Sequence, residues 1–225
     1  MTLLNSPPVT ATSRRTLILL SPLAVIAVVH FLARWADDVT GDGAWLVVAG
    51  AYWLLAVAAV FGFSTPAQRR TWLRPGDRVK WWVYAGAVLL GLFPVAGILL
   101  MNLDLLALHP GLILPWLVFA LVNPVVEETY WRGLLLDARG RWPFWLMALY
   151  STALFVLSHP LMWGVFSAGN RSAALFGSLA IMGLAWAFIR RATGSLRVPL
   201  WSHALVDVGN MSVFVFLNLY VPPGM

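Results

Sequence analysis

Long apolar stretches follow one another along almost the entire chain, separated by short polar segments. About 20 helical residues cross a hydrocarbon core of roughly 30 Å. Seven stretches approach or exceed that length: residues 16–33, 44–63, 81–101, 112–136, 144–160, 173–189 and 199–220. Because backbone groups in lipid must hydrogen-bond within their own segment, each stretch predicts a helix. The expected fold class is all-α, a polytopic membrane helix bundle of about seven transmembrane helices.

Basic residues lie mainly in the short segments between these stretches. Cytoplasmic loops of membrane proteins carry an excess of Lys and Arg. With seven crossings, twelve basic residues fall on one side of the membrane: Arg14, Arg15, Arg69, Arg70, Arg74, Arg78, Lys80, Arg139, Arg141, Arg190, Arg191 and Arg197. Only Arg34 and Arg171 fall on the other side, and Arg132 lies within a predicted helix. The pattern predicts a cytoplasmic N-terminus.

The composition is that of an integral membrane protein, with 60% hydrophobic and 11% charged residues and a mean hydropathy of +0.81. The net charge of +6 is explained by the basic loops, so no nucleic-acid partner is expected. The absence of cysteine excludes a disulfide framework and a cysteine protease. We expect a single membrane domain over residues 1–225, with a flexible cytoplasmic tail at 1–15, in a bacterial inner membrane.

Three ionisable groups interrupt the apolar stretch at 112–136, within the sequence NPVVEETYWRG. Such groups are costly inside a membrane and mark functional sites by default. Glu128 and Arg132 are four residues apart, on one face of a helix, and can neutralise one another. Glu127 has no such partner in its own segment and can serve as an acid or base. The alternative is a purely structural salt bridge, with Glu127 at the lipid headgroups.

Two later stretches add further ionisable groups. FVLSH places His159 directly before Pro160, which ends or kinks a helix, and WSHALVD places His203 and Asp207 on one helical face. A carboxylate and an imidazole that share a water can deprotonate it, while a second histidine stabilises an oxyanion. Glu127 and these residues could instead coordinate zinc, with one position left open for water. Both schemes predict hydrolysis within the membrane.

These segments resemble the motifs of the CPBP intramembrane proteases, the family that contains the CAAX prenyl endopeptidases of the Rce1 type. EETYWR matches its EExxxR motif, FVLSH its FxxxH motif, and TGSLRVPLWSHALVD its final histidine motif. The resemblance covers residues 112–210, which we expect to form the catalytic core. It implies an endopeptidase of the glutamate type that cleaves a membrane-associated protein or peptide and needs no cofactor.

The same resemblance implies roles for individual residues. Glu127 would be the base that activates water and His159 its partner. His203 and Asp207 would stabilise the oxyanion. Glu128 and Arg132 would support the site without taking part in the reaction.

Position 207 departs from the pattern, since the prenyl-protein proteases usually carry Asn where this chain has Asp. An ionised aspartate cannot donate a hydrogen bond to an oxyanion, so Asp207 must be protonated, orient His203 or bind a metal. This departure also weakens the expectation of a prenylated substrate. In straight helices, moreover, His159 and His203 would lie toward opposite membrane faces, so we expect tilted or broken helices around a cavity.

Two other classes of function are compatible with these residues. A non-catalytic scaffold could keep the fold and bind a partner, although it gains nothing from an unpaired Glu127. An ion or proton-coupled transporter could use Glu127, His159 and His203 as a relay, but the chain lacks the internal repeats that many transporters have. The sequence gives no indication of the oligomeric state.

Overall fold

The structure, a computed structural model, describes residues 11–222, and residues 1–10 and 223–225 lie outside the described part. Every regular element in the described range is helical, which confirms the all-α fold class. Most of the predicted tail at 1–15 lies outside that range, but residues 11–15 already belong to the first helix.

The described range contains these α-helices: α1 (Ala11–Thr40), α2 (Ala44–Phe63), α3 (Pro66–Trp72), α4 (Trp81–Gly97), α5 (Asp104–Leu108), α6 (Ile113–Glu127), α7 (Phe144–Leu161), α8 (Ala173–Thr193), α9 (Arg197–Gly209) and α10 (Ser212–Phe216). A π-helical segment, Glu128–Leu135, continues α6 without a break. Short 3-10 turns complete the connections: Gly41–Gly43, Leu99–Met101, Pro110–Leu112, Trp163–Val165 and Gly169–Arg171.

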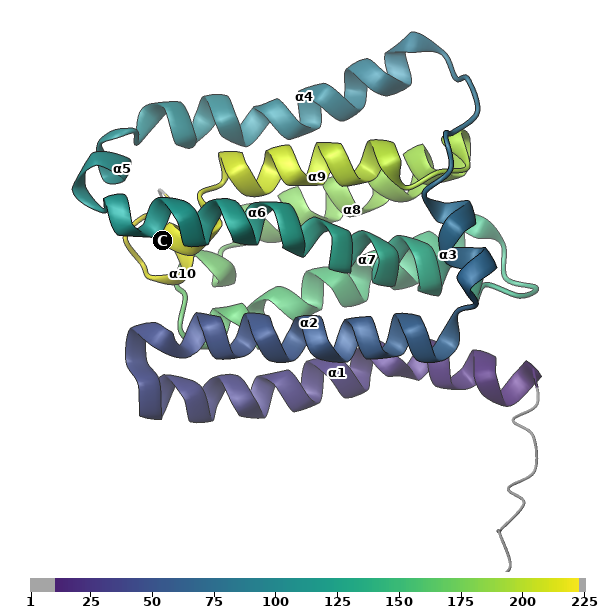
Figure 1. Ribbon diagram of the computed structural model, residues 1–225, viewed down its shortest axis with the longest axis horizontal. Coiled ribbons are helices and arrows are strands. Elements are labelled where there is room, and N and C mark those ends of the chain that lie inside the picture. Colours follow the sequence, from purple (N-terminus) through teal and green to yellow (C-terminus); the bar gives the residue numbers. More distant parts are fainter. Residues whose placement is uncertain (1–10, 223–225) are drawn as a thin grey trace, which may run out of the picture.

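Several helices are long and apolar enough to cross a membrane. In the described part of the chain, five segments meet this condition: Thr12–Phe63, Trp81–Met101, Pro110–Leu135, Phe144–Val165 and Ala173–Thr193. The first joins α1 and α2, which pack against each other as an antiparallel hairpin (Figure 1). These helices lie close to the first six predicted stretches.

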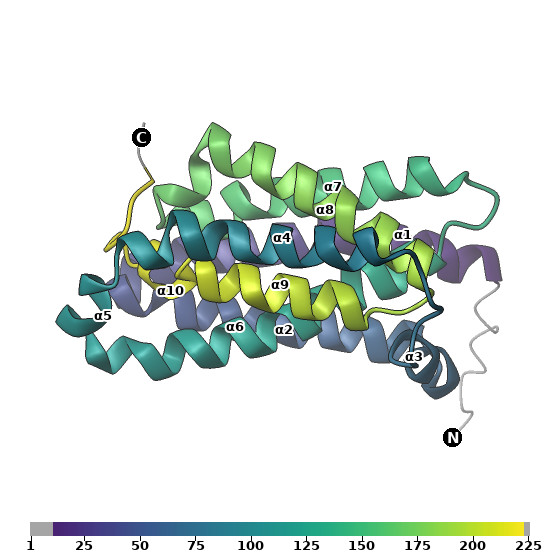
Figure 2. The ribbon, with the colours of Figure 1, turned by 90° about the horizontal axis from the view of Figure 1, so that it is seen from above.

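The predicted span at residues 199–220 is wrong in its extent. The helix α9 ends at Gly209 after 13 residues, about 20 Å at 1.5 Å per residue, which is too short to cross a bilayer alone. Met211 then adopts a left-handed backbone conformation with φ 54°, and the chain turns into α10. Figures 1 and 2 show α9 among other helices, and it contacts α4, α6 and α8. The polar residues of α9 can therefore face protein instead of lipid.

Two glycines allow α4 and α9 to pack very closely. A Cβ atom added at Gly209 would lie 2.8 Å from the carbonyl carbon of Pro94 in α4. A Cβ atom added at Gly91 would lie 2.8 Å from the Cβ atom of Leu205 in α9. Only glycine permits such an approach, so these residues fix the position of the helix that carries His203.

The predicted loop residues gather at one end of the bundle, where α1 begins, α3 lies and α8 turns into α9 (Figures 1 and 2). There the Arg15 Nε donates to the Ala138 carbonyl at 2.9 Å, and the Arg197 Nε donates to the Leu73 carbonyl at 2.7 Å. We call this the basic end, because it carries the twelve basic residues named above. The opposite end, with α5 and α10, is the far end. Which end faces the cytoplasm stays a prediction.

Candidate active site

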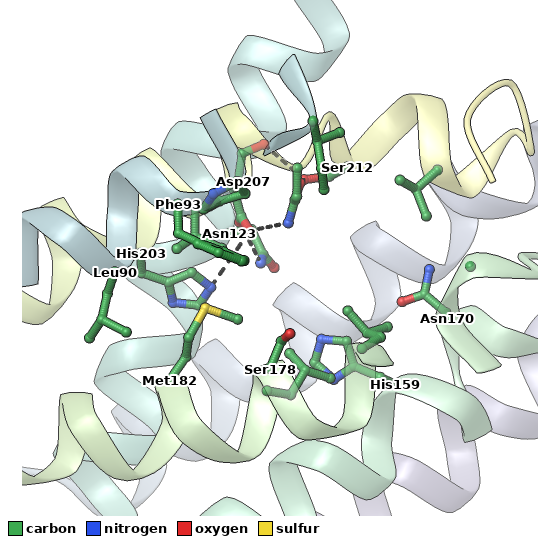
Figure 3. Close-up of a pocket in the computed structure, with 18 of the residues that line it drawn as sticks. Leu90, Phe93, Asn123, His159, Asn170, Ser178, Met182, His203, Asp207 and Ser212 are labelled. Atoms are coloured by element: carbon green, nitrogen blue, oxygen red, sulfur yellow. Dashed lines mark hydrogen bonds and ion pairs between the residues drawn. The ribbon is translucent and has the colours of Figure 1, made fainter. Parts of the chain in front are cut away.

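A cavity of about 580 Å³ lies inside the bundle, with walls from α4, α6, α7, α8, α9 and α10. Glu127, His159, His203 and Asp207 all line it. Figure 3 shows His203 and Asp207 on one side and His159 across the space from them. The structure thus brings the four residues with predicted catalytic roles to one cavity, although they come from three helices.

Glu127 has a partner from another helix. Its carboxylate lies 3.5 Å from the Nε2 atom of His203, and both side chains are almost fully buried. The Tyr52 hydroxyl of α2 also interacts with this carboxylate. The expectation that Glu127 is unpaired therefore holds only within its own segment.

His203 is held from its other side by Glu128. The His203 Nδ1 atom lies 3.0 Å from Glu128 Oε1, and the same oxygen accepts a hydrogen bond from Arg132 at 3.1 Å. Because an ionised carboxylate only accepts hydrogen bonds, Nδ1 must carry a proton. The ring of Trp186 stacks on the imidazole at a centroid distance of 4.2 Å. These contacts point the Nε2 atom toward Glu127.

The predicted ion pair of Glu128 and Arg132 is present, but within a π-helical segment and not an α-helix. Both side chains are buried, and Glu128 Oε2 and Arg132 Nη2 have no hydrogen-bond partner. The guanidinium lies over the rings of Phe155 and Trp186, at 4.4 and 5.2 Å from their centroids. Short π-helical segments inside α-helices occur frequently at functional sites. This one lets Glu127 and Glu128 both reach His203.

His159 faces the cavity with a defined tautomer. Its Nδ1 atom lies 2.9 Å from the Phe155 carbonyl oxygen, which can only accept, so Nδ1 carries the proton. The neutral imidazole then has a lone pair on Nε2. His159 and Glu127 line the same cavity without forming an ion pair. Any joint action on a substrate must therefore pass through a group bound between them.

Asp207 is surrounded by hydrogen-bond donors. The amides of Asn123 and Asn210 donate to its two oxygens at 3.1 and 3.5 Å, and His203 Nε2 lies 3.7 Å from Asp207 Oδ1. The Trp53 indole donates to Asn123 Oδ1 at 3.0 Å, which turns the amide NH₂ group toward Asp207. The two oxygens of Asp207 are thus held by side-chain amides from α6 and from the residue that follows α9.

Asn123 and Asn210 were missed by the sequence analysis, which considered only ionisable residues. Both line the cavity. The sequence did contain a signal for Asn123, because it stands four residues before Glu127 in an apolar helix and so shares its face. Asn210 follows the end of α9, where no helical periodicity indicates its direction.

The geometry of a metal site is absent from the described residues. Within residues 11–222, no group of three or more His, Cys, Asp or Glu side chains is arranged to hold a metal ion. The oxygens of Asp207 are engaged by amides, and His203 lies between carboxylates of two glutamates. Zinc coordination by the four predicted residues stays a prediction.

Comparisons with known proteins point to one family. A curated Escherichia coli protein, described as "Uncharacterized 24.3 kDa protein", is 30% identical over 97 residues, which cover 42% of this chain and 41% of that protein. Among the solved structures, none matches the chain. The family model of the type II CAAX prenyl endopeptidase Rce1-like proteins matches residues 109–209. This match covers the part of the chain that carries the three motifs and agrees with the family that they predict.

Proposed function

We propose that this protein is an intramembrane endopeptidase that hydrolyses a peptide bond of a membrane-associated protein or peptide. The Rce1-like match supports protease activity of the CAAX type in general, and the apolar helices support an integral membrane protein. The observation that carries the finer proposal is the contact of Glu127 with His203 Nε2 at the wall of a cavity that His159 also lines. We place the protein in a bacterial inner membrane.

The proposed reaction begins with a water bound between Glu127 and His159. The Glu127 carboxylate takes a proton from this water, and the lone pair of His159 Nε2 accepts the second hydrogen bond and orients it. The water oxygen bonds to the carbonyl carbon, whose oxygen becomes an oxyanion. Glu127 then gives its proton to the amide nitrogen, and the carbon–nitrogen bond breaks to leave a carboxylic acid and an amine.

The oxyanion needs hydrogen-bond donors that are already in place. His203 is one, because the carboxylates of Glu127, Glu128 and Asp207 surround its ring and favour the doubly protonated form, in which Nε2 donates. Asn123 is the second, because its NH₂ group lines the cavity and has one hydrogen beyond that given to Asp207. In this scheme Asp207 orients His203 and Asn123 and does not itself contact the oxyanion.

We propose that no metal takes part in this reaction, since the site residues are committed to one another. A strong chelator should leave the hydrolysis rate of the purified protein unchanged, and the protein should contain no stoichiometric zinc. If a chelator abolishes activity and zinc restores it, the proposal is wrong. Glu127, His159, His203 and Asp207 would then be metal ligands.

The test of the proposed function is product analysis with purified protein in lipid vesicles. Membrane-spanning model peptides are incubated in water enriched in oxygen-18, and the fragments are identified by mass. Hydrolysis predicts one solvent oxygen in the new carboxyl group of a defined fragment. A protein that binds such peptides at the cavity but never cleaves any of a broad set would favour the non-catalytic scaffold.

A further inference from the structure

The cavity extends from the candidate active site toward only one end of the bundle. Its lining includes Ile98 at the end of α4 and Gly169, Asn170, Ser212, Tyr220 and Pro222 from the segments at the far end. No lining residue comes from α3 or from the connections at residues 73–80, 136–143 and 194–196. The space therefore leads away from the basic end.

At the basic end, packed chain lies next to the π-helical segment. The Trp72 ring of α3 is buried and lies against Gly133 of the π-helical segment. Next to it, Ser195 Oγ donates to the Arg74 carbonyl at 2.7 Å, and the Asp77 backbone N–H donates to the Thr193 carbonyl at 2.8 Å. These bonds tie the connection between α3 and α4 to the turn between α8 and α9. These contacts place packed chain between the π-helical segment and this part of the basic end.

The side of the cavity between α4 and α8 is open to the surface of the bundle. Leu89 and Phe93 of α4 and Ile181 of α8 line the cavity, yet 68%, 76% and 65% of their surfaces are exposed. In a membrane these side chains contact lipid. A membrane-inserted chain can therefore reach the cavity sideways as well as from the far end.

The cavity accepts an uncharged chain. Apart from Glu127, His159, His203 and Asp207, no ionisable side chain with an acidic, basic or imidazole group lines it. A charged side chain of a substrate could pair there only with these four residues, which the proposed reaction needs, and elsewhere in the cavity it would be buried at a cost of several kcal/mol per charge. The apolar wall of α4 and α8 instead suits aliphatic side chains.

The distance of Glu127 from the far end determines how far a substrate must enter the bundle. Pro110 to Glu127 span about 25 Å along the helix axis at 1.5 Å per residue. An extended peptide that entered from the far end would need about eight residues at 3.3 Å per residue to reach Glu127. A segment that reaches Glu127 by this route must therefore be inserted about eight residues deep.

We infer that the substrate is an uncharged, apolar segment of a membrane-inserted polypeptide, and that the segment and the hydrolytic water reach the site from the extracytoplasmic side. This inference rests on the proposed function and on the predicted cytoplasmic position of the basic end. It separates this protein from a peptidase that receives a chain terminus from the cytoplasm.

Single cysteines test the route directly, because the chain has no cysteine of its own. Ser178→Cys places a thiol in the cavity wall. Thr71→Cys, exposed on α3, reports the basic end, and Ala107→Cys, exposed on α5, reports the far end. Intact and permeabilised bacterial cells that contain each variant are treated with a small, charged, membrane-impermeant thiol reagent.

The inference predicts labelling of Ser178→Cys and Ala107→Cys in intact cells, and of Thr71→Cys only after permeabilisation. Labelling of Ser178→Cys only after permeabilisation, or in neither preparation, would overturn the route, and so would labelling of Thr71→Cys in intact cells. Labelling does not require catalysis. An inactive protein with the predicted labelling pattern would therefore contradict the proposed function alone.

Cleavage of model peptides in lipid vesicles tests the substrate class separately. A single lysine placed at the cleaved position of an apolar model peptide should abolish cleavage, whereas leucine at the same position should preserve it. Equal cleavage of both peptides would overturn the requirement for an uncharged segment and leave the labelling result untouched.

Discussion

At the residue scale, the site is a chain of charged and polar contacts that runs from Arg132 through Glu128 and His203 to Glu127. Each member is buried, so each needs its neighbour to compensate for lost hydration. Sequence reasoning found every ionisable member, because charged residues in apolar stretches are conspicuous. It predicted the pair of Glu128 and Arg132 but not the contacts of His203 with the two glutamates, which join residues more than 70 positions apart.

Asn123 is the residue that sequence reasoning should have added. Asn123→Leu removes an amide donor at the cavity while keeping a similar volume, and we expect kcat to fall about 10²- to 10³-fold, the usual cost of an oxyanion donor. Asn123→Gln should recover part of this loss. The measurement is kcat and KM for one model peptide, together with thermal stability in detergent.

Asn102→Leu is the control, since the Asn102 amide donates to the Ile98 carbonyl outside the site. A loss of stability in Asn123→Leu with unchanged kcat for the folded protein would assign Asn123 a structural role only.

At the scale of elements, the first six helices were predictable because apolar length alone defines them. The end of α9 was not, although Gly209 and Asn210 mark a helix end in the sequence. The residues that follow are also apolar, because α10 is buried against other helices. In the sequence, this apolar segment cannot be told from the continuation of a transmembrane helix. The π-helical segment has no comparable sequence signal.

The buried pair of Glu128 and Arg132 should contribute to the stability of the protein, and Glu128 should also contribute to activity. Glu128→Leu leaves Arg132 buried without a counter-charge, and the loss of one partner of a buried pair costs about 3–5 kcal/mol. Adding Arg132→Met should restore much of the stability, as thermal unfolding in detergent would record. Activity should stay low in the double variant, because His203 Nδ1 has lost its acceptor. Full recovery of activity would show that Glu128 does not position His203.

The close contact of α4 with α9 gives a second prediction at this scale. Gly209→Ala adds a Cβ atom against the backbone of α4, and overpacking of this kind costs about 1–3 kcal/mol. Gly50→Ala in α2 is the matched control, because a Cβ atom there meets nothing within 4 Å. We expect a lower unfolding temperature for the first variant only. Equal stability would mean that α4 can move away from α9 at no cost.

At the scale of the whole molecule, the bundle has a basic end and a cavity that leads toward the far end. The sequence predicted this polarity through its basic loops, and the structure gathers those loops at one end (Figure 2). A cavity was expected from the sequence, but its walls were not predictable, because they combine residues from six helices whose packing no local pattern encodes. The expected separation of His159 and His203 does not prevent a shared site, because both residues line this cavity.

Hydrolysis by a water activated at Glu127 is the central claim about the whole molecule. Its most direct test is kcat for a cleaved model peptide, compared between the wild-type protein, Glu127→Gln and Asp104→Asn, an exposed carboxylate on α5. Glu127→Gln should fold normally and lose about 10²- to 10⁴-fold in kcat, the range for removal of a general base, while Asp104→Asn keeps full activity. A Glu127→Gln variant with the wild-type kcat would contradict the mechanism.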